Sequence, residues 1–172
     1  MWRGAEVRTE CSADLTVPAY IPEGYVPAAE QRMDLYRRIA ALRTPADEAD
    51  LMDELLDRYG DVPKPVTALL NVAMLRAAAM ETGITDITQK GRQLIFSFDM
   101  RIEPAALLAV CGMAGYRDRL QLAAGASPKL TLFLQPREDA LDAAGGLVEQ
   151  LRLQQNELQL QGQQPQEGGN EP

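Results

Sequence analysis

The 172-residue sequence contains no histidine and only two cysteines, Cys11 and Cys111. Without histidine the chain cannot form a Ser-His-Asp or Cys-His nucleophile system, and it cannot bind a metal ion through imidazole. Two cysteines far apart in sequence form neither a disulfide framework nor a four-ligand zinc site. We therefore expect both thiols to pack as small hydrophobic side chains, and we predict no catalytic residue, no cofactor and no metal site.

Long apolar runs are also missing. No segment approaches the roughly 20 apolar residues that a membrane-spanning helix needs. The first residues, Met1 to Glu6, lack the hydrophobic segment of a signal peptide. These absences predict a soluble, cytoplasmic protein that does not interact with a membrane.

The composition is that of a globular protein with a strong acidic bias. Hydrophobic residues make up 46% of the chain and charged residues 24%, and the formal net charge is −8. A negative field repels phosphate backbones and favours contact with basic protein surfaces. We therefore do not expect this chain alone to bind DNA directly, and we expect a protein partner instead.

The order of hydrophobic patterns predicts an α+β fold in a single domain. An N-terminal strand and three helices are followed by a small β-sheet with two further helices. The helices are expected over residues 27–43, 45–59, 65–82, 103–113 and 138–156. The strands are expected over residues 10–20, 84–88, 92–98, 120–123 and 129–134.

Composition divides the chain into three parts. Residues 1–9 are mixed and polar and are predicted to be a linker or disordered, whereas residues 10–153 carry the folded domain. Residues 154–172 are rich in Gln, Gly, Glu and Pro, so we predict a disordered tail there.

One helix end carries the main candidate interaction site. Glu54 and Asp57 are three positions apart and share a helix face, and Arg58 lies beside them at the negative end of the helix. Leu55 and Leu56 are expected to point the other way, into the core. The arrangement predicts two carboxylates and a guanidinium available for charge-assisted contacts with a partner. The alternative is an ordinary solvated helix end.

Two other functions remain open from the residues alone. The acids of the helix over 45–59, such as Asp53 and Asp57, could form a metal-dependent hydrolase site, although no convergent ligands accompany them. Arg37, Arg38 and Arg43 could bind nucleic acid or RNA polymerase directly, although the net charge opposes binding to nucleic acid.

Three runs in a fixed order carry a family resemblance. AYIPEGYVP (19–27), LYRRIA (35–40) and LLDRYGDVP (55–63) together resemble the C-terminal domain of the bacterial transcription-repair coupling factor. The resemblance covers about residues 10–152. It implies a domain of a large ATP-driven DNA translocase, whose motor lies upstream of this domain, so no enzymatic activity is expected of this chain.

The resemblance also implies a regulatory role. In that family, the C-terminal domain is similar to a clamp: it packs on a UvrB-like module and hides the surface that UvrA binds. The positions matching Glu54, Asp57 and Arg58 contact that module, so these three residues are the predicted partner interface. UvrA and RNA polymerase would then be indirect partners.

Overall fold

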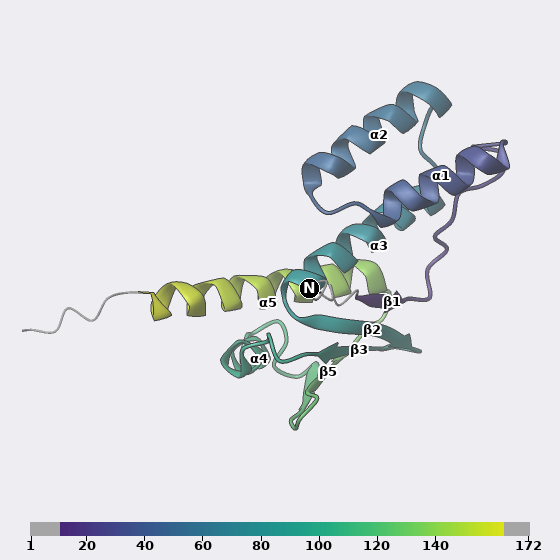
Figure 1. Ribbon diagram of the computed structural model, residues 1–172. Helices are drawn as coiled ribbons and strands as arrows, with labels where there is room; N and C mark the ends of the chain where they lie inside the picture. The colour runs from purple at the N-terminus through teal and green to yellow at the C-terminus, as the bar shows by residue number, and fades with distance from the viewer. Residues whose placement is uncertain (1–10, 164–172) are drawn as a thin grey trace, which may run out of the picture.

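The computed structural model describes residues 11–163, and its elements follow the predicted order (Figure 1). The helices are α1 (Ala29–Ala40), α2 (Pro45–Tyr59), α3 (Lys64–Glu81), α4 (Pro104–Cys111) and α5 (Ala140–Gly162). The strands are β1 (Ser12–Asp14), β2 (Ile84–Lys90), β3 (Gln93–Phe98), β4 (Leu120–Ala123) and β5 (Lys129–Phe133). The predicted α+β class and single-domain organisation are confirmed.

All five strands form one sheet in the order β1-β2-β3-β5-β4. β1 runs parallel to β2, and the remaining neighbours are antiparallel. β1 is much shorter than the predicted strand over residues 10–20. The backbone N–H of Thr16 donates to the Gln89 side chain at 2.8 Å instead of a strand neighbour, and Pro18 has no N–H to donate. The alternation nevertheless continues past the end of the strand, where half-buried and exposed residues alternate as far as Tyr20.

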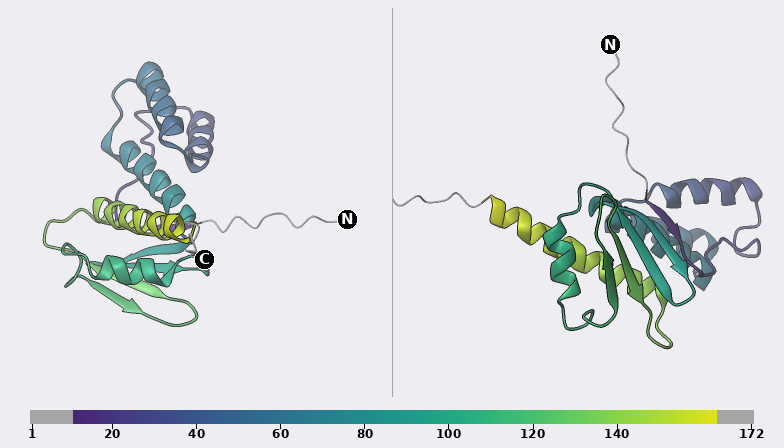
Figure 2. Two further views of the ribbon diagram at one scale, coloured as in Figure 1. Left: turned by 90° about the vertical axis from the view of Figure 1, so that its left-hand side faces the viewer. Right: turned by 90° about the horizontal axis from the view of Figure 1, so that it is seen from below.

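Residues 11–163 form two separate hydrophobic cores, and α3 contributes to both. One core lies between α1, α2 and the N-terminal half of α3, and includes Leu35, Leu55 and Leu70. The other lies between the sheet, α4, α5 and the C-terminal half of α3, and includes Phe96 and Leu147. Figures 1 and 2 show α1 and α2 standing away from the sheet, with α3 leading from them to it. The candidate interaction site therefore lies on the first core, at a distance from the sheet.

The predicted disordered tail begins too early, because α5 continues to Gly162. Leu151 and Gln155 are both buried, and the N–H of Glu103 donates to the Gln155 side chain at 3.5 Å. Gln, Leu and Glu also have good helix propensity, so this polar composition does not break the helix. Residues 164–172 of the predicted tail, and the predicted linker over residues 1–9, lie outside the described residues.

Candidate functional site

The predicted interaction site lies at the C-terminal end of α2. Thr44 starts this helix with a capping box, in which its hydroxyl accepts from the Asp47 N–H while its own N–H donates to the Asp47 carboxylate. Gly60 ends the helix with a φ of +82°, a conformation that glycine adopts without steric cost. Asp57 and Arg58 are exposed and Glu54 is half-buried, so the three side chains form a charged patch on the surface. We call Glu54, Asp57 and Arg58 the charged patch.

Glu54 is not free within the charged patch, because two arginines bind it. Arg38 of α1 donates from both terminal nitrogens to the two carboxylate oxygens, and Arg58 donates to the same carboxylate at 3.2 Å. The hydrogen bonds from Arg38, with a further contribution from Arg58, lower the pKa of Glu54 to about 2. Glu54 therefore joins α1 to α2 and holds Arg58 in place.

Arg58 is also positioned by an aromatic ring. Its guanidinium carbon lies 5.3 Å from the centroid of the Tyr59 ring, within the range of a cation–π contact. The Tyr59 hydroxyl in turn donates to the Gln31 side chain at 3.1 Å. Arg58 is thus presented to solvent from a defined position, which reduces the entropy lost when it binds a partner carboxylate.

The ion pairs of Glu54 predict a pH-dependent contribution to stability. The pKa of Glu54 in the folded state lies below its ordinary value of 4.5, so the contribution is present above pH 4.5 and is lost as the pH falls towards 2. We expect Glu54→Gln to lower the free energy of unfolding at pH 7 and to have progressively less effect below pH 4.5. Urea unfolding of both proteins across this range measures the difference. Glu157→Gln, at an exposed position of α5, is the control, and an equal pH dependence in both variants contradicts the prediction.

Leu56 was predicted to be in the core, and that prediction is wrong. Its side chain is 45% exposed, whereas Leu55 is 1% exposed. Successive helical residues differ by about 100° in direction, and of these two leucines Leu55 points into the core between α1, α2 and α3, whereas Leu56 points towards solvent. An apolar side chain thus lies beside Asp57 on the outer face of α2.

Sequence reasoning missed Arg38 as part of this site. Arg38 and Glu54 lie on different helices, so no local spacing relates them. Tyr36, two positions before Arg38 on α1, has a structural role. Its hydroxyl oxygen accepts a hydrogen bond from the backbone N–H of Ile21 at 2.8 Å, which fixes the segment before α1.

The two alternative sites gain no support from the geometry. Arg43 donates to the carbonyl groups of Ala40 and Leu42, and Arg38 binds Glu54, so two of the three arginines proposed for nucleic-acid binding are engaged. Among residues 11–163, no group of three or more acidic or cysteine side chains is close enough to hold a metal ion.

Cys11 lies in the hydrophobic core that includes the sheet, and Cys111 packs against that core. Cys11 is fully buried, and its burial raises the pKa of the thiol to about 11, so it is a poor nucleophile at neutral pH. Burial also raises the pKa of Cys111. In the described part of the chain, no helix is long and apolar enough to cross a membrane.

Comparison with known proteins relates this site to a family. A family model described as the TRCF domain matches residues 15–106, which is more than half of the chain and includes the charged patch. A crystal structure of the C-terminal domain of transcription-repair coupling factor superposes with a TM-score of 0.71 at 20% identity. That match covers 88% of this chain and 99% of the other, and it shows a shared fold.

Three curated relatives are similar in sequence over part of the chain. The transcription-repair-coupling factor of Mycobacterium bovis is 41% identical over 86 residues, or 50% of this chain and 7% of the relative. The Escherichia coli factor is 30% identical over 103 residues, or 59% and 9%. The Bacillus subtilis factor is 35% identical over 80 residues, or 46% and 7%. The chain therefore spans less than a tenth of the length of these relatives.

Proposed function

This chain belongs to the TRCF domain family, and we propose that it is a non-catalytic regulatory domain that docks on the UvrB-like module of a transcription-repair coupling factor. Docking would mask the surface of that module to which UvrA binds, and its release would connect a stalled RNA polymerase to excision repair. The observation that carries the proposal is the charged patch on a rigid helix end, within the residues that match the family.

The three residues of the charged patch have different roles in this proposal. Asp57 is exposed and forms no ion pair within residues 11–163, so its carboxylate is available to an arginine or lysine of the module. Arg58 uses one terminal nitrogen for Glu54 and keeps further donors for a carboxylate of the module. Glu54 acts as a positioning residue, because Arg38 and Arg58 already occupy its oxygens.

A charged contact of this kind is suited to a switch. A tethered domain has a high effective concentration near its target, so each contact can be weak. A closing preference of a few kcal/mol keeps the open state rare, and ligands that prefer the open state can reverse it. The exposed Leu56 adds apolar area beside the charges without making the interface predominantly hydrophobic.

Calorimetry with the UvrB-like module of a transcription-repair coupling factor tests the proposal. We expect Asp57→Lys and Arg58→Glu each to weaken binding at least tenfold, because each places like charges together across the interface. Binding should also weaken as salt rises, since the contacts are near the surface. Asp118→Lys makes the same charge change as Asp57→Lys at an exposed position outside the charged patch and should leave binding within about twofold.

Two outcomes contradict the proposal. Affinity that is unchanged in both charge reversals would place any contact elsewhere on the domain. Absence of binding by the wild-type protein at high concentration would remove the docking itself.

A further inference from the structure

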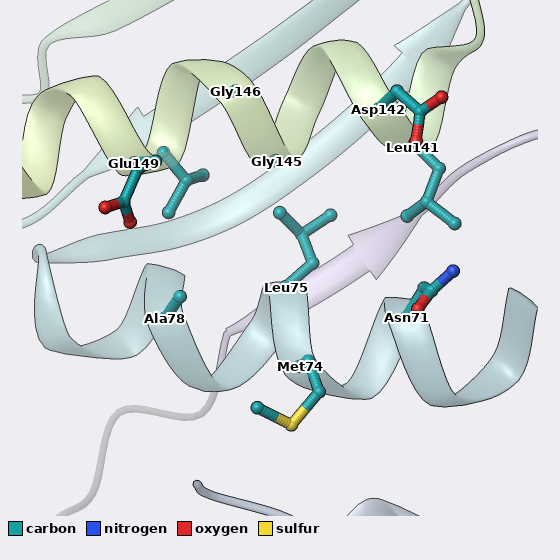
Figure 3. Close-up of a pocket in the computed structure, with 10 residues that line it drawn as sticks. Asn71, Met74, Leu75, Ala78, Leu141, Asp142, Gly145, Gly146 and Glu149 are labelled. Carbon is teal, nitrogen blue, oxygen red and sulfur yellow. The ribbon is translucent and has the colours of Figure 1, made fainter. Parts of the chain in front are cut away.

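A groove runs between α3 and α5, on a different part of the molecule from the charged patch. It consists of two adjoining hollows of about 370 and 490 Å³, which share Asn71, Leu141 and Asp142 as lining residues. Figure 3 shows the first of them, with α5 above and α3 below. We call this feature the α3–α5 groove.

Both helices line the groove with residues at the spacing of a single helix face. On α3 the lining positions are Lys64, Pro65, Thr67, Ala68, Asn71, Met74, Leu75 and Ala78, and the second hollow is also lined by Val17 and Pro18 of the segment after β1. On α5 they include Asp142, Gly145, Gly146 and Glu149, again three or four positions apart. At a rise of about 1.5 Å per residue, the stripe on α3 is about 21 Å long, which is the length of about four helical turns. The stripe on α3 therefore matches the length of a four-turn helix that would lie along it.

Gly145 keeps the middle of the groove open. A Cβ atom at this position would meet nothing within 4 Å, and Gly145 has no positive φ that would require glycine. In Figure 3, Leu141 and Asp142 lie at one end and Glu149 at the other, with Gly145 and Gly146 bare between them. Glycine lowers helix propensity relative to alanine. Gly145 therefore leaves the middle of the groove open, although neither a close neighbour nor its backbone conformation requires glycine there.

The groove has an apolar floor and an acidic rim. Leu75 and Val148 are buried beneath it, and Met74 and Ala78 are half-buried beside them. Its charged lining residues are three acids, Asp139, Asp142 and Glu149, and one base, Lys64.

The three acids differ in how far they are already engaged. Arg152 binds Glu149 at 2.7 Å, and Asp139 caps α5 by accepting from the N–H of Asp142 at 2.9 Å. The Asp142 carboxylate forms no ion pair with any residue from 11 to 163. Lys64, the one base of the lining, likewise forms no ion pair among these residues, so the three acids and one base give the groove a formal charge of −2.

We propose that the α3–α5 groove binds a basic amphipathic helix of a partner protein. Aliphatic side chains at every third or fourth position of that helix would enter the groove over Gly145 and contact Leu75 and Val148. Flanking lysine or arginine residues would lie against Asp142 and the N-terminal end of α5. A second copy of this chain is disfavoured as the occupant, because its net charge of −8 opposes an acidic rim. The groove shares no residue with the charged patch, so this proposal does not depend on the proposed function.

A synthetic 15-residue helical peptide, with leucines along one face and lysines elsewhere, is the probe. We expect it to bind the wild-type chain in NMR titrations, with chemical-shift changes centred on Asn71, Ala78 and Gly145. A second peptide keeps the lysines but has glutamine in place of leucine, and it should bind at least tenfold more weakly. This comparison separates apolar docking from attraction between a polycation and an acidic protein.

Two pairs of variants locate the binding. Gly145→Leu fills the groove and should weaken binding of the leucine peptide at least tenfold, whereas Ala49→Leu adds the same side chain on exposed α2 and should have no effect. Asp142→Lys should weaken binding about tenfold, whereas Asp118→Lys should not. Circular dichroism and urea unfolding check that each variant is folded. If Gly145→Leu does not fold, Asp142→Lys still tests the proposal.

Three results overturn the proposal. The first is equal affinity of the leucine peptide for the wild-type chain, Gly145→Leu and Asp142→Lys. The second is a set of chemical-shift changes centred on the exposed Met100 and Leu108 rather than on the groove. The third is a wild-type protein that is dimeric in sedimentation and becomes monomeric as Gly145→Leu, which would assign the groove to a second copy.

Discussion

Replacing Leu55 with alanine is expected to lower the free energy of unfolding by about 3 kcal/mol. The side chain is 1% exposed and belongs to the core between α1, α2 and α3. Its removal loses buried apolar area and leaves a cavity that the three short helices cannot fully close. Urea unfolding measures the change. Amide hydrogen exchange should show a greater loss of protection in α1 and α2 than in β3, because the sheet packs on the other core.

Leu56→Ala is the matched control for this experiment. The substitution is chemically identical and one position along the chain, but Leu56 is 45% exposed. We expect it to change the free energy of unfolding by no more than about 0.5 kcal/mol. Equal destabilisation by both variants would contradict the separation of the α2 face into a buried and an exposed side. Leu55→Ala should also weaken docking on the UvrB-like module, because it loosens the helix that carries the charged patch.

The elements that sequence predicts well depend on local rules. Thr44, Pro45 and Gly60 define the ends of α2 through a cap, a proline at the first helical position and a glycine of positive φ. The strand β3 follows from the alternation of Leu94, Phe96 and Phe98, which are all buried. Each of these signals lies within one element, so the sequence alone contains it.

The features that sequence missed depend on contacts between distant segments. β1 ends early because a side chain of β2, Gln89, takes the N–H of Thr16. α5 extends past the predicted tail boundary because Gln155 is buried against the segment that begins α4. Composition correctly describes these residues as polar, but it does not report which neighbour satisfies their hydrogen bonds.

The two proposed interaction sites also differ in how far local sequence signals predict them. The spacing of Glu54, Asp57 and Arg58 and a family resemblance predict the charged patch, but the engagement of Glu54 by Arg38 is visible only in three dimensions. The α3–α5 groove joins helices that are far apart in sequence. Gly145 and Gly146 lie within α5, and glycine inside a helix indicates by itself a locally weakened helix and not an opening.

Gly83→Ala is expected to destabilise the protein by about 3 kcal/mol, as the sum of two effects. Gly83 has a φ of +81°, which costs an alanine about 1 kcal/mol or more. A Cβ atom there would also lie 3.0 Å from an Asp99 carboxylate oxygen and 3.1 Å from the backbone nitrogen of Ile102. Both neighbours are held by hydrogen bonds. The Asp99 N–H donates to the Gly83 carbonyl at 2.9 Å, and the Asp99 carboxylate accepts from the Arg101 N–H. The Ile102 N–H donates to the Asp99 carbonyl at 3.4 Å.

Gly91→Ala separates the two effects. Gly91 has a φ of +57° in the turn between β2 and β3, but a Cβ atom there would meet nothing within 4 Å. We therefore expect a loss of only about 1 kcal/mol from the backbone conformation, measured by urea unfolding under the same conditions. Equal losses at the two glycines would mean that the close approach to Ile102 costs nothing. A larger loss at Gly83 would show that the turn joining α3 to β2 requires the absence of a side chain.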